Sequence, residues 1–219
     1  MRITVFTPAY NRGYIIEKLY RSLQNQTFRN FEWLIIDDGS SDNTSEKIQS
    51  FIQDNNDFPI IFEKVENGGK HRAINLGVQK ARGELFFIVD SDDYLTNTSL
   101  EIVDQVEKAI PKEQKKNFAG ICGERGYSEN EIMGTTFKGD VIDITSLERM
   151  QYGITGDKAE VFYTKVLKQY PFPEFEGEKF LTECIVWDRI AAAGYKLRYF
   201  NKIIYLSLIH ISEPTRLQL

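Results

Sequence analysis

Three groups of polar and acidic residues stand at the ends of apolar runs, where an α/β protein usually carries its chemistry. They are Thr7-Pro8-Ala9-Tyr10-Asn11, Asp37-Asp38-Gly39-Ser40 and Asp90-Ser91-Asp92-Asp93. In an open α/β sheet, ligands gather at the carboxyl ends of the strands. If the apolar runs are strands, the three groups meet at one edge of the sheet. Their shared placement is more informative than any one of them alone.

The third group offers two carboxylates, Asp90 and Asp92, separated by Ser91. Carboxylate oxygens suit Mg²⁺ or Mn²⁺, which usually bind through one or two carboxylates together with substrate phosphates. The alternative is an acidic turn that caps the following segment. Because two further groups end strands in the same way, we favour the metal site.

Asp38, in the second group, ends a strand and can accept a hydrogen bond from an N–H group of a nucleobase, with Tyr10 as a stacking face. The alternative is an Asx turn through Asp38-Gly39-Ser40. The two interpretations are compatible, because such a turn can aim the carboxylate.

A glycine-containing segment, Asn67-Gly68-Gly69-Lys70-His71-Arg72, opens a predicted helix. A helix N-terminus with nearby cations is suited to anions, whereas a tight turn before a solvated basic face is the alternative. The sequence contains neither a P-loop nor a G-x-G-x-x-G motif, so an ordinary NTPase or dinucleotide fold is not supported.

Glu183 begins another predicted helix, next to Cys184. A carboxylate there can act as a general base, or can simply complement the helix dipole. Cys184 is a poor candidate for a nucleophile, because neither His71 nor His210 can be placed beside it. No zinc-binding pattern is present.

The first half of the chain alternates strand-like and helix-like patterns, which predicts an α/β domain with a mainly parallel central sheet flanked by helices. The expected strands are Ile3–Thr7 (ended by Pro8), Phe31–Asp37, Pro59–Val65 and Leu85–Val89. The expected helices are Ile15–Leu23, Ser45–Gln53, His71–Ala81 and Leu100–Ile110.

The second half is less regular and predicts a smaller, mixed sub-lobe. We expect strands at Phe118–Cys122 and Leu197–Leu206, hairpin-like strands within Ile132–Ile144, and a helix at Thr182–Ala193 closed by Gly194. The expected organisation is residues 1–110 as an α/β half and 111–206 as a second half of the same domain. Residues 207–219 lack the helical periodicity seen elsewhere in the chain and are expected to be an ordinary, foreign or truncated tail.

Composition excludes several classes of protein. The chain has 219 residues, 42% of them apolar and 27% charged, which is typical of a soluble globular protein. Its net charge is 27 − 32 = −5, so it offers no electrostatic basis for binding duplex nucleic acid. It has no apolar run long enough for a membrane span and no signal peptide, and its two cysteines suit a reducing compartment. We expect a cytoplasmic protein.

The motifs, taken in order, resemble family 2 glycosyltransferases. The resemblance is carried by Val5–Asn11, Ser22–Phe28, Asp37–Asp42, Ala81–Glu84 and Asp90–Asp93, and extends weakly to the Glu183 segment. It implies a GT-A fold, which is a Rossmann-like α/β sandwich. It also implies inverting transfer from a nucleotide-diphosphate sugar, commonly in bacterial surface polysaccharide or cell-envelope glycan synthesis.

The resemblance implies that residues 1–110 are the nucleotide-sugar-binding half and that residues 111–206 hold the acceptor and the catalytic base. It also assigns the donor site. Thr7, Ala9 and Tyr10 would line the nucleotide loop, and Asp38 would hold the base, usually uracil. Lys70 and His71 fall where the family often contacts the donor.

The same resemblance makes Asp92 a ligand of the divalent cation, Mn²⁺ or Mg²⁺, that bridges the diphosphate. Asp90 would contact the ribose or the metal shell, with Ser91 between them. Glu183 falls at the segment in which the family carries its catalytic base, frequently as a Thr-Glu-Asp motif. Here the segment reads Thr182-Glu183-Cys184.

The chemistry of inversion is consistent with these roles, because it needs a base for the acceptor hydroxyl and a cation for the leaving diphosphate. The expected partners are a UDP-sugar, a glycan or lipid-linked acceptor and, peripherally, the inner face of a membrane. Two alternatives stay open, a non-catalytic sugar-nucleotide binder and a metal-dependent phosphohydrolase or nucleotidyltransferase.

Overall fold

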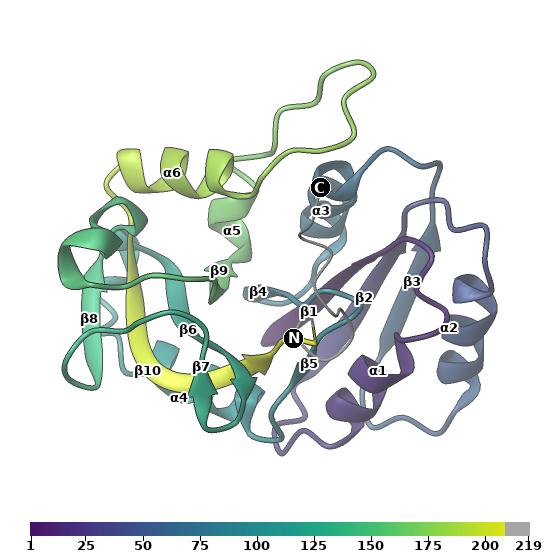
Figure 1. Ribbon diagram of the computed structural model, residues 1–219, viewed down its shortest axis with the longest axis horizontal. Helices are drawn as coiled ribbons and strands as arrows, with labels where there is room; N and C mark the ends of the chain where they lie inside the picture. Colours follow the sequence, from purple (N-terminus) through teal and green to yellow (C-terminus); the bar gives the residue numbers. More distant parts are fainter. Residues whose placement is uncertain (209–219) are drawn as a thin grey trace, which may run out of the picture.

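The computed structural model describes residues 1–208, which form a central sheet flanked by helices (Figure 1). The strands are β1 (Ile3–Ala9), β2 (Phe31–Asp37), β3 (Ile60–Lys64), β4 (Leu85–Ile88), β5 (Tyr94–Leu95), β6 (Phe118–Ser128), β7 (Glu131–Ile132), β8 (Val141–Ile144), β9 (Lys158–Tyr163) and β10 (Lys196–Leu206). The helices are α1 (Glu17–Gln24), α2 (Thr44–Gln53), α3 (Lys70–Lys80), α4 (Ser99–Lys108), α5 (Thr164–Leu167) and α6 (Cys184–Ala192), with 3-10 helices η1 (Lys115–Asn117) and η2 (Ser146–Tyr152).

The strands run in the order β3-β2-β1-β4-β9-β6-β10-β5, with β7 beside β6 and β8 beside β10. In the first half, β3, β2, β1 and β4 are all parallel, as predicted. Every residue of β2 is buried, which explains the apolar run from Trp33 to Ile36. Because β2 and β3 lie to one side of β1 and β4 lies to the other, right-handed crossovers place α1 and α2 on one face and α3 on the opposite face (Figure 1).

β1 continues two residues beyond its predicted end at Thr7, through Pro8 to Ala9. The reason lies in the direction of the backbone groups. The Phe6 carbonyl accepts from Val89 on the β4 side, and Pro8, two residues on, faces the same side. β4 has already ended there, at Ile88, so the N–H that proline lacks is not needed for the ladder.

The second half makes the sheet mixed, as expected for the smaller, mixed sub-lobe. β9 is antiparallel to both β4 and β6, and so joins the two halves. β10 is parallel to β6 but antiparallel to β5 and β8. Of the expected hairpin-like strands, β7 pairs with β6, whereas β8 pairs with the distant β10. The sequence patterns did not predict β9.

The last helix and strand agree with the predicted pattern. α6 ends as expected before Gly194, whose φ of 88° is the left-handed conformation that favours glycine. β10 then curves through the second half and reaches β5 (Figure 1). The predicted tail begins at Ser207 and Leu208, where the Leu208 N–H donates to Asp93 Oδ1 at 3.0 Å. From residue 209 onward, the tail lies outside the described residues.

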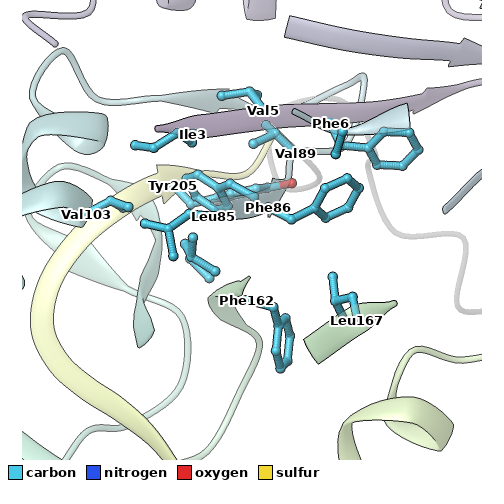
Figure 2. Packing of buried hydrophobic residues seen from close by; sticks show 14 of the residues in the cluster. Ile3, Val5, Phe6, Leu85, Phe86, Val89, Val103, Phe162, Leu167 and Tyr205 are labelled. Atoms are coloured by element: carbon cyan, nitrogen blue, oxygen red, sulfur yellow. The ribbon is translucent and has the colours of Figure 1, made fainter. Parts of the chain in front are cut away.

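The buried core is shared by both halves (Figure 2). Phe6 of β1 stacks on Phe86 of β4, with their ring centroids 5.0 Å apart. Phe87 of β4 approaches Tyr205 of β10 at 6.3 Å. The labelled cluster contains Ile3, Val5, Phe6, Leu85, Phe86, Val89, Val103, Phe162, Leu167 and Tyr205. Within residues 1–208, no helix is both long enough and apolar enough to cross a bilayer.

Candidate active site

A cavity of about 560 Å³ opens at the carboxyl ends of β1, β2 and β4, and its far wall comes from the second half of the chain. Its lining residues are Pro8, Ala9, Tyr10, Arg12, Asp38, Lys70, Ile88, Asp90, Ser91, Asp92, Asp93, Arg125, Arg149, Asp157, Lys158, Glu160, Thr182, Glu183, Cys184 and Trp187. The three strand-end groups therefore meet, as the sheet geometry predicts.

Two of the ten predicted site residues, Thr7 and His71, do not line this cavity. Thr7 is fully buried, and its Oγ1 accepts a hydrogen bond of 2.9 Å from the indole of Trp33. His71 is 1% exposed on the first turn of α3, and neither ring nitrogen has a hydrogen-bond partner within residues 1–208. Both side chains belong to the supporting layer beneath the site.

Asp38 anchors the loop that precedes α3. Its carboxylate accepts hydrogen bonds from the backbone N–H groups of Gly68 at 2.7 Å and Gly69 at 2.9 Å. Asn67 Nδ2 adds a third bond at 3.1 Å. Gly69 has φ = 97°, and a Cβ there would lie 2.1 Å from the carbonyl oxygen of Lys179, so only glycine fits this close approach. Asp38 thus orders the backbone that leads into Lys70, a lining residue of the cavity.

Lys70 joins the two halves of the site. Its Nζ lies 2.6 Å from Asp90 Oδ1 and 2.7 Å from Glu183 Oε1. Burial disfavours the ammonium, but the charges of Asp90 and Glu183 outweigh this and raise the pKa of Lys70. Burial likewise disfavours ionised Asp90, yet Lys70 and Arg125 lower its pKa below the usual range. The ion pairs therefore hold Lys70 and Asp90 in their charged forms and keep Glu183 close to Lys70.

The carboxylates of the Asp90-Ser91-Asp92-Asp93 turn have different surroundings. Asp92 is one-third exposed, and its only ion pair in the described chain is with Arg12 at 3.6 Å. Asp93 is buried and accepts a hydrogen bond of 2.7 Å from Tyr205. Burial raises the pKa of Asp93, and the neighbouring Asp90 and Asp92 add to this effect. Asp92 is thus the carboxylate best placed for a ligand from solvent.

The donor set near this turn fits a divalent cation that is completed by a substrate. Within residues 1–208, no group of three or more His, Cys, Asp or Glu side chains is arranged to hold a metal ion. Asp92 and Asp90 supply hard oxygen atoms from two positions, and Mg²⁺ or Mn²⁺ commonly takes one or two carboxylates and draws its other ligands from phosphates and water. A cation held by Asp92 would therefore depend on a bound diphosphate.

Glu183 reaches the cavity because the segment 171–183 is attached to α3. Asn75 exchanges hydrogen bonds with Phe172, donating from Nδ2 at 3.0 Å and accepting at Oδ1 at 2.9 Å. Arg72 donates to the carbonyl of Phe175 at 2.7 Å. At the other end, Trp187 of α6 packs on Phe162 of β9 with ring centroids 4.3 Å apart. Glu183 lies between these two attachments.

Sequence reasoning missed six charged residues of the lining: Arg12, Arg125, Arg149, Asp157, Lys158 and Glu160. Arg125 lies 3.9 Å from Asp90 and over the ring of Tyr205 at 4.1 Å. Arg12 follows the first strand-end group directly, so its position in the sequence could have indicated that it lies at the site. The other five come from the second half, whose strands are joined by long-range pairing that no local pattern reveals.

The sequence profile of Glycosyl transferase family 2 matches residues 4–157, which is most of the chain. The chain belongs to glycosyl transferase family 2. This confirms the family resemblance of the strand-end motifs. The match covers β1 to the end of η2, and so it includes every donor-side residue of the cavity but not Glu183.

Two bacterial glycosyltransferases are relatives of this family 2 chain. It is 27% identical to the glycosyltransferase GlyG of Streptococcus pneumoniae, over 93% of this chain and 69% of GlyG. It is 26% identical to the GalNAc(5)-diNAcBac-PP-undecaprenol beta-1,3-glucosyltransferase of Campylobacter jejuni, over 85% of this chain and 58% of that protein.

Solved structures confirm the fold of the family 2 chain. The crystal structure of S. aureus TarS superposes with a TM-score of 0.73 at 22% identity, over 95% of this chain and 37% of TarS. The mannosyltransferase PcManGT of Pyrobaculum calidifontis, solved with GDP-Man and Mn²⁺, gives a TM-score of 0.64 at 20% identity, over 92% of this chain and 55% of that one. The chain therefore has the GT-A fold and spans only part of these neighbours.

Proposed function

We propose that this chain transfers a sugar from a UDP-sugar to a hydroxyl group, with inversion, in the synthesis of a bacterial glycan. The observation that carries the proposal is the Lys70 bridge, which brings the strand-end carboxylate Asp90 and the helix-end carboxylate Glu183 into one cavity. TarS has been solved with UDP and with UDP-GlcNAc, which supports the choice of UDP.

The nucleotide would bind along β1 and the loop before α3. Tyr10 is 48% exposed at the cavity and offers an aromatic face for the base, next to Ala9. Asp38 would recognise the base through its carboxylate, already oriented by the amides of Gly68 and Gly69. Lys70 would turn its ammonium toward the donor phosphates.

A divalent cation, Mn²⁺ or Mg²⁺, would be held by Asp92 with help from Asp90. When bound, such a cation neutralises the charge that develops on the leaving diphosphate. Arg12 and Arg125, which already pair with these carboxylates, bring further positive charge to the same side of the cavity. Ser91, buried between the two aspartates, keeps the turn compact.

Glu183 would act as the general base. The acceptor hydroxyl gives its proton to the Glu183 carboxylate, its oxygen bonds to the anomeric carbon, and the bond from that carbon to the diphosphate oxygen breaks. Attack from the face opposite the leaving group inverts the anomeric centre. Cys184 stands where the family pattern has an aspartate, and its thiol lies 3.2 Å from Thr182 Oγ1. Glu183 is therefore the only carboxylate of Thr182-Glu183-Cys184, and it pairs with Lys70.

The acceptor would be a hydroxyl of a glycan or of a lipid-linked saccharide, presented at the inner face of a membrane. The printed name of the Campylobacter jejuni relative includes an undecaprenol-linked acceptor, which supports this class.

Calorimetric titration of UDP tests the donor site. We expect binding with Mn²⁺ that is lost with EDTA and in Asp92→Asn, and retained in Asp140→Asn, a control at an exposed carboxylate outside the cavity. Absence of UDP binding to the wild type under both conditions contradicts the proposal. Analysis of the products then separates two reactions: sugar transfer releases UDP and leaves the transferred sugar intact, whereas phosphohydrolysis releases free phosphate. Binding of UDP without any turnover indicates a sugar-nucleotide binder.

A further inference from the structure

Glu160 is a cavity residue to which the donor site and the base assign no role. It lies on β9 opposite Cys122 of β6 and is half-buried. Residues two apart on a strand share a face, so Glu160 lies on the same face as Phe162, against which Trp187 packs. That contact holds α6 over this face of β9. Glu160 therefore lies near the first turn of α6, close to Glu183.

The carboxylate of Glu160 lacks a partner of the kind that its neighbours have. Asp38 is bound by backbone amides, Asp90 by Lys70 and Asp93 by Tyr205. In residues 1–208, by contrast, no hydrogen bond or ion pair joins the Glu160 carboxylate to another residue, although Arg125 and Arg149 lie within electrostatic reach.

The surroundings make this position costly for an isolated charge. Burial raises the pKa of Glu160. The charges of Arg125 and Arg149 offset this rise only in part, and the charge of Glu183 adds to it. A half-buried carboxylate is stabilised when it accepts hydrogen bonds. Since the protein supplies none from other residues in the described chain, hydroxyl donors of a bound ligand would meet this need.

We propose that Glu160 is a specificity-determining residue that accepts hydrogen bonds from the hydroxyl groups of the acceptor sugar, and that this subsite takes a neutral saccharide. The inference rests on the proposed function, because it takes Glu183 as the base and so places the acceptor ring beside it. An ionised carboxylate only accepts hydrogen bonds, and its two oxygens match two neighbouring hydroxyls. An acceptor with its own carboxylate would meet repulsion from Glu160 and Glu183.

Saturation-transfer NMR on the full chain loaded with UDP and Mn²⁺ tests this subsite. The probes are the methyl glycosides of glucose, galactose, mannose and N-acetylglucosamine, with methyl glucuronide as the anionic comparison. We expect at least one neutral probe to bind more tightly than the glucuronide. Glu160→Gln, which is nearly isosteric, should weaken that probe by about tenfold, as loss of a charge-assisted hydrogen bond implies.

The control variant is Glu129→Gln, an exposed carboxylate outside the cavity, which should bind the probes like the wild type. UDP affinity and the melting temperature, measured on every variant, report the donor site and the fold. Unchanged probe affinity in Glu160→Gln overturns the inference. So does a wild type that binds UDP but no neutral probe, or that prefers the glucuronide. Loss of UDP binding in the wild type contradicts the proposed function instead.

Discussion

Lys70 and its two carboxylate partners give the site its charge balance at the scale of single residues. The positively charged Nζ lies within 2.7 Å of an oxygen of Asp90 and of Glu183, so the donor-side and acceptor-side groups are coupled before any ligand binds. A diphosphate entering the cavity would compete with these carboxylates for Lys70. Release of Glu183 from Lys70 would then leave the base available to an acceptor.

Replacing Glu183 with glutamine should abolish transfer while UDP binding stays intact. A general base contributes about 10²–10⁴-fold to the rate, and glutamine keeps the shape of the side chain without its basicity. The measurement is UDP release with donor and acceptor present, beside calorimetric UDP titration. Glu176→Gln, an exposed carboxylate of the same segment, is the matched control and should behave like the wild type. If Glu183→Gln kept normal turnover, the base would have to be another carboxylate of the cavity.

The stability of the protein should depend on pH through the pair of Lys70 and Asp90. The pKa of Asp90 is lowered in the folded state, so its stabilising contribution is present above the ordinary aspartate value of 3.8 and is lost as the pH falls through the lowered value. Lys70, whose pKa is raised, keeps its contribution up to its ordinary value of 10.5. Lys70→Met should therefore lower the free energy of unfolding between about pH 5 and 9, with a smaller deficit near pH 3.

Urea denaturation at pH 3, 5 and 7 measures this difference. Lys202→Met, which removes an exposed lysine of β10, serves as the control and should show little deficit at any pH. A deficit in Lys70→Met that stays constant from pH 7 to pH 3 would show that lost packing, not the ion pair, causes it.

At the scale of elements, the attachment of segment 171–183 to α3 positions Glu183, the proposed base. Asn75 makes two hydrogen bonds to the backbone of Phe172 and one of 2.7 Å to Glu174. Asn75→Ala removes all three and should destabilise the fold by only about 1–2 kcal/mol, because the segment is largely exposed. It should nevertheless speed amide hydrogen exchange across residues 171–183 and lower transfer more than UDP binding.

Gln79→Ala is the matched control for that experiment, since Gln79 is an exposed amide on the same helix. It should leave hydrogen exchange in 171–183 unchanged. If exchange in Asn75→Ala were also unchanged, the segment would be held by other contacts, such as those of Arg72 with the Phe175 carbonyl and of Lys179 with Asn67.

The elements that were predicted correctly are those whose surroundings are uniform. β2 was predicted with both bounds because it is buried along its whole length and carries an unbroken apolar run from Trp33 to Ile36. β9 was missed because its first residues, Lys158 and Glu160, carry charges that serve an ion pair and the cavity rather than the core. A strand that lines a site loses the periodicity by which strands are recognised.

The residues of the candidate site also divide into those that the sequence could predict and those that it could not. Donor-side residues such as Asp38 and Asp90 could be placed from sequence, since each ends a strand of one parallel sheet and strand ends converge by geometry. The bridge from Lys70 to Glu183 could not, because it depends on how a segment without regular structure packs on α3. The location of Glu160 depends on the antiparallel pairing of β9 with β4 and β6, which is set by contacts distant in sequence.

At the scale of the whole molecule, the two halves share one sheet and one core. β9 pairs with β4 of the first half and with β6 of the second, and β10 reaches β5. Apolar side chains from both halves pack together in the cluster of Figure 2. Separating the halves would expose the edge of β4 and the rings on it, so neither half is expected to be stable alone.

The two tryptophans of the chain make this cooperativity measurable, because one lies in each half. Trp33 is fully buried in β2, and Trp187 lies on α6 against Phe162. In Trp187→Phe the fluorescence reports the donor half, and in Trp33→Phe it reports the acceptor half. Within each variant, the urea transition seen by fluorescence should coincide with that seen by far-ultraviolet circular dichroism, as two-state unfolding requires. A Trp187 transition at lower urea than the dichroism of the same variant would show that the acceptor half unfolds first. In that case the cavity could be lost while the donor half still binds UDP, and loss of transfer on mild denaturation would precede loss of UDP affinity.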